Sequence, residues 1–256
     1  MIGVVDIRRF PVKGLGGQPL DRIELAAGTP IRGDRRFAFA HDESAFDCAA
    51  PAWQPKREFL QLARDPGVAP VHAALDDAAE LLTLTGGFGT GRSITIAPGS
   101  PAGRAEAAAF LAAETGGIRR PGQRLVELDE GGTLSDTGAP FVSIISLATV
   151  GAIAALARQP LDPRRFRGNI LIDGAEPWAE FEWIGRQVQL GGATLRVLKR
   201  IPRCPATEVN PITAERDARP VTELRALYGH ADLGIYAEVV EGGRFAIGDA
   251  IELLPE

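Results

Sequence analysis

Short apolar runs separated by glycine- and proline-containing turns constrain the fold of this chain more than any other feature. The 256 residues include 30 Gly and 19 Pro, and these show no triplet period of the kind that collagen requires. Runs this short are typical of β-strands joined by turns, because a helix needs a longer periodic segment to bury one face. The sequence therefore predicts a protein built mainly from short strands.

The predicted strands are spread over both halves of the chain. They cover residues 4–7, 22–25, 37–39, 81–84, 93–96, 169–173, 187–190, 195–198, 234–240 and 249–254. Two pairs are expected to form hairpins, 81–84 with 93–96 and 187–190 with 195–198, because a glycine-rich turn joins each pair. A strand followed by a helix is expected within 140–157, and further helices at 104–114 and 221–228. This pattern predicts a mainly β fold of the α+β class, with a domain boundary between residues 117 and 136.

Composition excludes several classes of protein. The chain is 45% apolar and 24% charged, which is too apolar for a disordered protein. Its net charge of −5 argues against a general nucleic-acid binder. The longest apolar stretch, residues 139–156, is interrupted by polar residues and glycine, and the N-terminus lacks the apolar centre of a secretion signal. We therefore expect no nucleic-acid or membrane partner and a cytoplasmic location.

The two cysteines, Cys48 and Cys204, form no disulfide framework and no zinc-binding motif. Cys204 lies in RIPRCPAT, residues 200–207, where neighbouring guanidinium groups favour a thiolate that acts as nucleophile or metal ligand. Proline on both sides of Arg203 and Cys204 predicts a stiff loop. The alternative is a buried structural cysteine beside solvated arginines, since free cysteine is among the most buried residue types. From this segment alone both interpretations stay open.

Other candidate segments are turns with basic or polar side chains. FRGN, residues 166–169, places Arg167 and Asn169 two positions apart before a strand, so that both project to one side and can donate hydrogen bonds to phosphate or a polar heterocycle. PVKGLGG, residues 11–17, places Lys13 at a glycine-rich turn whose amides can meet an anion. GDRRF, residues 33–37, adds Arg35, and SDTG, residues 135–138, is a polar turn. Each of these, taken alone, can equally be an ordinary solvated turn.

The chain lacks a GxSxG nucleophile motif, a GxGxxG dinucleotide motif and a complete phosphate-binding P-loop. Its paired carboxylates, at residues 76–77 and 129–130, lie in polar stretches that are typical of solvated surface.

The order of the motifs resembles the MOSC family with its N-terminal β-barrel domain. The motifs are PVKGLGG, GDRRFAF, SDTGAPF, FRGNILIDG followed by EPWAE, and RCPATEVNPITAERD. Within that family the chain is similar to the mitochondrial amidoxime-reducing components and their bacterial counterparts. The resemblance implies a β-barrel-like N-terminal domain, residues 1–118, packed on a MOSC β-barrel core, residues 119–256, with peripheral helices and a cofactor cleft between the two.

The resemblance also implies a set of site residues. Cys204 matches the cysteine that binds the molybdenum of a pterin cofactor and is thereby the catalytic residue. The other implied cofactor contacts are Lys13, Gly14, Arg35, Asp136, Thr137, Arg167, Asn169, Pro202, Arg203 and Tyr236. Arginine binds phosphate with paired hydrogen bonds, and a thiolate is a soft metal ligand, so these residue types fit an anionic, sulfur-rich cofactor.

The resemblance thus implies a molybdenum-dependent oxidoreductase that reduces small N-hydroxylated compounds to amines. The chain has no cysteine set for an iron–sulfur domain, so we expect a separate electron donor such as a ferredoxin or flavoprotein. Two alternatives remain: a sulfur carrier with a persulfide on Cys204, and a molybdenum cofactor carrier without turnover.

Overall fold

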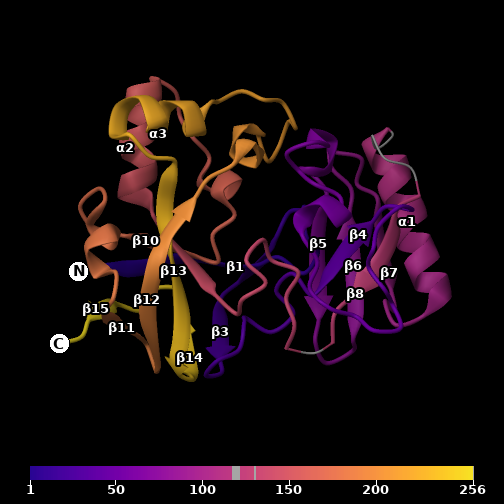
Figure 1. Ribbon diagram of the computed structural model, residues 1–256, viewed down its shortest axis with the longest axis horizontal. Coiled ribbons are helices and arrows are strands. Elements are labelled where there is room, and N and C mark those ends of the chain that lie inside the picture. Colours follow the sequence, from indigo (N-terminus) through magenta and orange to yellow (C-terminus); the bar gives the residue numbers. More distant parts are fainter. Residues whose placement is uncertain (117–121, 130, 256) are drawn as a thin grey trace.

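The largest sheet has eight strands in the order β15-β11-β12-β13-β9-β10-β1-β2 and forms one of two parts that lie side by side (Figure 1). The computed structural model describes residues 1–116, 122–129 and 131–255. The strands of this sheet are β1 (Gly3–Arg9), β2 (Gln18–Leu20), β9 (Val142–Ser146), β10 (Ile170–Asp173), β11 (Gln187–Leu190), β12 (Ala193–Pro202), β13 (Asp232–Glu241) and β15 (Ile251–Leu253). Only β9 and β10 pair in parallel among these strands.

This sheet curls until its two ends meet. Gly3 of β1 forms a bridge with Ala250, and the amides of Val4 and Ile251 donate hydrogen bonds across this seam at 2.9 and 3.0 Å. Twenty buried apolar residues, contributed mainly by the strands, fill the inside of the curl. The sheet is therefore barrel-like, with its core inside.

Helices cover the outside of this sheet. α2 (Leu147–Ala157) connects the parallel strands β9 and β10, and α3 (Pro220–Tyr228) packs against α2. Short 3₁₀ turns lie in the connections: η3 (Pro163–Phe166), η4 (Ala179–Trp183) and η5 (Pro205–Glu208).

The second part contains two small sheets and the longest helix. β4 (Phe37–Ala40) pairs with β8 (Arg124–Glu127), and β5 (His72–Asp76), β6 (Leu81–Thr85) and β7 (Ser93–Ile96) form a meander. α1 (Pro101–Thr115) packs against β7 and β8, and η1 (Lys56–Glu58) and η2 (Pro66–Val68) lie in the loops. A separate core of buried apolar residues lies between these elements.

The chain crosses between the two parts several times. β1 and β2 belong to the large sheet, and β3 (Arg22–Leu25) pairs with β14 (Gly243–Ala246) near the other end of the chain. Bridges from Val12 to Phe37 and from Gly16 to His72 then tie the segment after β1 to the second part. The predicted boundary at 118/119 lies outside the described residues.

Most predicted elements are present, and the mainly β fold of the α+β class is confirmed. Both predicted hairpins form, as β6–β7 and β11–β12. α1 begins three residues before its prediction, because the Ser100 side chain accepts a hydrogen bond from the Gly103 amide and Pro101 occupies the first turn.

Four strands were not predicted: β2, β5, β8 and β14. Their sequences are short or contain proline, alanine and charged residues, so pairing with distant strands defines them rather than local propensity. The loop predicted at Arg203 and Cys204 is present between the two prolines. Pro202 is the last residue of β12, where a missing amide is tolerated, and Pro205 begins η5.

Across the described residues, none of the helices combines the length and the apolar character that a membrane crossing needs.

Candidate functional site

A cavity of about 170 Å³ lies where the two parts of the molecule face each other. It is lined by all eleven residues predicted from the sequence: Lys13, Gly14, Arg35, Asp136, Thr137, Arg167, Asn169, Pro202, Arg203, Cys204 and Tyr236. These residues come from segments as far apart in sequence as the turn after β1 and strand β13, so only the tertiary fold brings them together. Their roles toward a cofactor stay a prediction.

Two of the arginines are placed by left-handed backbone. Arg35 has φ 51° and Arg167, which follows η3, has φ 54°. The Arg35 amide donates to the Phe10 carbonyl at 2.7 Å, and the Arg167 amide donates to the Arg164 carbonyl at 3.0 Å. Left-handed conformations are uncommon for side chains of this size, and they persist where surrounding contacts impose them. The backbone therefore directs both guanidinium groups toward the same place.

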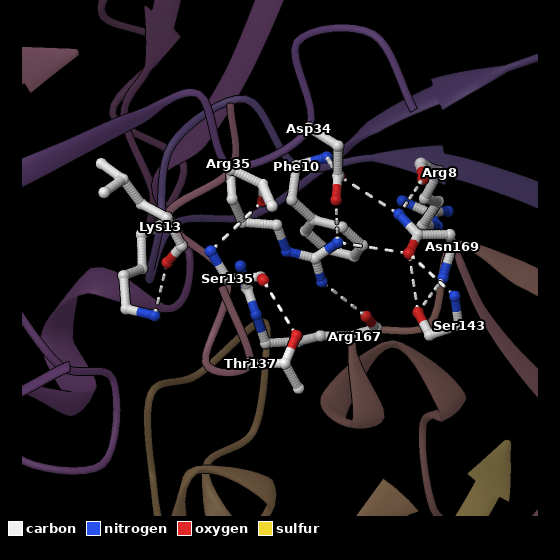
Figure 2. Close-up of polar contacts among 12 residues, drawn as sticks. Arg8, Phe10, Lys13, Asp34, Arg35, Ser135, Thr137, Ser143, Arg167 and Asn169 are labelled. Atoms are coloured by element: carbon white, nitrogen blue, oxygen red, sulfur yellow. Dashed lines mark hydrogen bonds and ion pairs between the residues drawn. The ribbon is translucent and has the colours of Figure 1, made fainter. Parts of the chain in front are cut away.

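Asn169, at the start of β10, is the centre of the hydrogen-bond network in Figure 2. Its Oδ1 accepts from the Ser143 hydroxyl at 2.7 Å and from Arg35 Nη1 at 3.3 Å. Its Nδ2 donates to the Arg8 carbonyl and to Asp34 Oδ1, both at 3.1 Å. Both amide hydrogens and the oxygen are thus used by the protein. Asn169 positions Arg35 and Asp34.

The guanidinium groups of Arg35 and Arg167 lie close together. Their central carbons lie 4.5 and 4.4 Å from the centre of the Phe10 ring, and Arg35 Nη2 donates to the Arg167 carbonyl at 3.0 Å (Figure 2). Burial, followed by the positive charge of Arg35, lowers the pKa of Arg167 to about 9. A pKa this low for an arginine shows a strong demand for negative charge at this position.

Arg203 is held by backbone oxygens on the other wall of the cavity. Its Nε donates to the Leu233 carbonyl at 2.7 Å and its Nη1 to the Phe166 carbonyl at 2.8 Å. Burial lowers the pKa of this guanidinium to about 10. Cys204 follows directly as the residue before η5, with a free, half-buried thiol. The Thr207 hydroxyl donates to the Cys204 carbonyl at 2.9 Å and fixes this turn.

Lys13 is buried at the lip of the glycine-rich turn. Its Nζ donates to the Leu134 carbonyl at 2.8 Å and forms an ion pair with Asp136 at 2.5 Å. Burial lowers the pKa of Lys13, and Asp136 partly opposes this. Burial would raise the pKa of Asp136, but the charge and hydrogen bond of Lys13 outweigh it and hold that pKa below its ordinary value. The carboxylate of Asp136 therefore holds Lys13 in its charged form.

The other predicted residues line the cavity with fewer polar contacts. The ring of Tyr236, on β13, lies 5.6 Å from that of Phe141, and burial raises the pKa of its hydroxyl. Thr137 shares a hydrogen bond with the Ser135 hydroxyl at 3.2 Å. Gly14 has φ +89°, a conformation that favours glycine, and Pro202 is exposed at the rim.

Sequence reasoning missed several lining residues. Asp34 belongs to the GDRRF motif, residues 33–37, and forms an ion pair with the neighbouring Arg35. The adjacency of the two charges is a signal that the sequence contains. Ser143 faces Asn169 only because β9 and β10 pair, which nothing in the local sequence indicates. Arg165, 3% exposed, is bound to the Thr207 carbonyl and to Asp217. Lys56, at the exposed rim, comes from a loop with no distinctive motif.

The lining groups are suited to an anion that brings its own metal ligands. The lining contains two carboxylates, those of Asp34 and Asp136, and six cationic side chains, those of Lys13, Arg35, Lys56, Arg165, Arg167 and Arg203. No group of three or more His, Cys, Asp or Glu residues able to hold a metal occurs within the described ranges. A metal in this cavity would therefore have one protein thiolate, Cys204, and further ligands from a bound molecule. The residues present fit an anionic cofactor with soft sulfur ligands.

Comparison with known proteins gives a match to a family model, a relative with a similar sequence, and similar solved structures. The family model of the MOSC domain matches residues 136–252. Human mitochondrial amidoxime-reducing component 1 is 29% identical over 132 residues, which cover 47% of this chain and 38% of that protein. This chain thus spans well under half of the length of that relative.

Two solved structures are similar at low sequence identity. The YuaD protein from Bacillus subtilis aligns with 99% of this chain and 96% of its own, at 14% identity and a TM-score of 0.47. YiiM from Geobacillus stearothermophilus aligns with 44% of this chain and 54% of its own, at 16% identity and a TM-score of 0.35.

Proposed function

From the MOSC domain that this chain contains at residues 136–252, we propose that the protein binds a molybdenum–pterin cofactor and reduces small N-hydroxylated compounds. Similarity to an amidoxime-reducing component supports the choice of reaction. The reaction converts an N–OH group to N–H with loss of water, and it consumes two electrons and two protons. When bound, the cofactor supplies the two-electron redox chemistry that this conversion needs. A separate electron-donor protein, a ferredoxin or a flavoprotein, supplies the electrons.

The observation that carries the proposal is the convergence of six cationic side chains on a cavity that is also lined by one free thiol, that of Cys204. Arg167 and Arg203 have pKa values lowered to about 9 and about 10, first by burial. Buried cations at this density are stabilised by an anionic ligand, because its charge offsets both their desolvation and their mutual repulsion. A cofactor phosphate and a metal-bound sulfur group together supply that charge.

In this proposal the lining residues fall into three groups: a metal ligand, residues that bind anionic groups, and a residue that positions one of these. Cys204 provides the thiolate ligand of the metal, and η5 fixes its position. Arg35, Arg167 and Arg203 bind the anionic groups, since their guanidinium planes suit bidentate contacts with phosphate. Asn169 acts on the cofactor only through Arg35, because protein atoms already satisfy its own amide group.

The metal content of purified protein tests the proposal. Protein produced in a host that makes the cofactor is assayed for molybdenum and for oxidised pterin by fluorescence, as wild type, Cys204→Ala and Cys48→Ala. We expect near-stoichiometric molybdenum and pterin in the wild type and in Cys48→Ala, because Cys48 is exposed and does not line the cavity. Cys204→Ala should lose the metal.

Turnover is measured on the loaded protein with a chemical reductant and an amidoxime or hydroxylamine. Amine formation that requires Cys204 supports the reductase. A loaded protein that forms no amine is a cofactor carrier. A protein free of pterin that carries labile sulfur on Cys204 is a sulfur carrier instead.

A further inference from the structure

A second, smaller cavity lies against the first, on η3 and the glycine-rich turn. Its volume is about 30 Å³, and its lining includes Arg8, His72, Arg164, Arg165 and Arg167. Arg165 and Arg167 also line the larger cavity, so these two side chains separate the two spaces. A buried water needs roughly 10–15 Å³ by the same measure, so this cavity has room for one small polyatomic ion and not for an organic cofactor.

We propose that this second cavity is a binding site for a phosphate-type oxyanion. All five of its ionisable lining residues are basic, and none of the described lining residues is a carboxylate. Three of the arginines pair with carboxylates elsewhere: Arg8 with Asp6, Arg164 with Asp162 and Arg165 with Asp217. Those pairs use only part of the donor capacity of a guanidinium, which has five N–H groups.

Arg165 supplies an independent indication of a missing acceptor. Its side chain is almost fully buried, and Nη1 and Nη2 donate to the Thr207 carbonyl and to Asp217 at 3.1 and 3.0 Å. Its Nε is buried and has no hydrogen-bond partner among the described residues. Buried donors are nearly always satisfied in native proteins, so this one indicates an acceptor supplied by a ligand.

His72 lies among these arginines and can report on an anion bound there. Its ring packs against Gly16, where a Cβ would lie 2.5 Å from Nδ1, and Nδ1 lies 3.4 Å from the Gly17 carbonyl. Burial lowers the pKa of His72, and the charges of Arg164, Arg8 and Arg167 lower it further, against the opposing hydrogen bond to the Gly17 carbonyl. An anion held by these arginines has the opposite effect, because it stabilises the imidazolium.

The experiment follows His72 by proton NMR. The three histidines of this chain, His41, His72 and His230, are titrated with pH in the presence of increasing inorganic phosphate at constant ionic strength, and His72→Gln assigns the signal. We expect a saturable rise of about 1 unit in the pKa of His72, the size that a neighbouring opposite charge produces, with His230 unchanged. Sodium chloride and perchlorate at the same ionic strength should produce no such rise.

Two variants with the same change of charge separate the site from general effects. Arg164→Gln alters a residue that lines only the smaller cavity and should weaken phosphate binding about 10-fold, since charge-assisted contacts are among the stronger hydrogen bonds. Arg244→Gln, at an exposed arginine of β14, should leave it unchanged. A His72 response that does not saturate, or that Arg164→Gln leaves intact, overturns the proposal.

Phenyl phosphate distinguishes the source of the oxyanion. If only inorganic phosphate raises the pKa of His72, the site takes the free ion. If phenyl phosphate acts equally well, the site takes the phosphoryl end of a larger molecule. Because the readout needs no molybdenum, loss of the proposed reductase function would leave this result standing.

Discussion

The polar side chains at this site form hydrogen bonds with one another as well as lining the cavity. Asn169 uses its whole amide group on Arg35, Asp34, Ser143 and a backbone carbonyl. Asp136 binds Lys13 through Oδ1. Buried polar networks of this kind stay ordered because each unpaired member would carry a desolvation cost. The positions of the charged side chains in the cavity therefore depend on their polar neighbours.

The Lys13–Asp136 pair predicts that removal of the carboxylate changes the pKa of the Lys13 amine. In Asp136→Asn the pKa of Lys13 should fall further, by about 1 to 2 units, because burial then acts without a compensating carboxylate. Nitrogen-15 NMR of the lysine side chains measures this directly. The chain has two other lysines, and Lys199 serves as the internal control, because Lys56 lines the same cavity and its charge also acts on Asp136. An unchanged pKa for Lys13 would contradict the role given to Asp136.

Glu180 predicts a pH dependence of stability away from the site. It is fully buried in η4, accepts a hydrogen bond from the Thr149 hydroxyl at 2.9 Å, and has a pKa raised by burial. The native state keeps this proton at pH values where the unfolded chain has lost it. Stability therefore falls as the pH rises from the unfolded pKa toward the folded pKa, by up to about 1.4 kcal/mol per pH unit.

In Glu180→Gln this part of the pH slope should disappear. Urea denaturation at several pH values from 4 to 7 compares the variant with Glu182→Gln, an exposed neighbour that should keep the wild-type slope. Equal slopes in all three proteins would show that Glu180 ionises normally.

At the scale of elements, the site depends on where strands and turns end. η3 ends in left-handed Arg167 and leads into β10, and β12 ends at Pro202, directly before Arg203 and Cys204. Gly234, in β13, allows this strand to lie close to both β9 and Arg203. It has φ +75° within β13, and a Cβ there would lie 2.7 Å from the Ile144 carbonyl oxygen and 3.1 Å from Arg203 Nη2. The lack of a side chain at Gly234 thus leaves room for the Arg203 guanidinium.

Gly234→Ala should therefore destabilise the protein by about 2–4 kcal/mol, through both backbone strain and the clash with β9. Gly28→Ala is the matched control, since Gly28 also has positive φ, +69°, but no atom lies within 4 Å of the position that its Cβ would take. That variant should lose only about 1–2 kcal/mol from strain. Equilibrium urea unfolding measures both, and equal losses would exclude the proposed clash.

At the scale of the whole molecule, the site exists because two parts with separate cores are held face to face. Arg167 Nη1 donates to the Leu15 carbonyl at 2.6 Å across this junction. Arg216 makes a second connection. It donates to the Pro205 carbonyl at 3.1 Å beside Cys204 and to the Ala63 carbonyl in the loop opposite. Both contacts use backbone oxygens, so they fix the loops themselves.

Arg216→Gln should loosen the loop at residues 61–65. Loss of about 1 kcal/mol of hydrogen bonding corresponds to roughly 5-fold faster local opening. Hydrogen exchange of the Arg64 and Asp65 amides, which both donate to the Gln61 carbonyl, reports this opening. Arg244→Gln, whose ion pair with Glu24 lies between β3 and β14, should leave those amides unchanged. Unchanged exchange in Arg216→Gln would show that the loop is held by its own contacts.

Patterns that are local in the chain are enough to predict the class of fold and the residue types that line the cavity. Short apolar runs bounded by turns, such as residues 81–84, predict strands, and β6 forms there with alternately buried side chains. The ordered motifs around Lys13, Arg35, Arg167 and Cys204 singled out the residues that line one cavity. These signals are local in the chain, so the sequence carries them.

The arrangement of those residues depends on contacts between distant segments. β5 and β8 lack a strong strand sequence and exist through pairing with distant partners. Ser143 joins the site because β9 pairs with β10, and Arg165 lies between two cavities because η3 packs against η5. Contacts of this kind depend on packing between segments far apart in sequence, which no local pattern encodes.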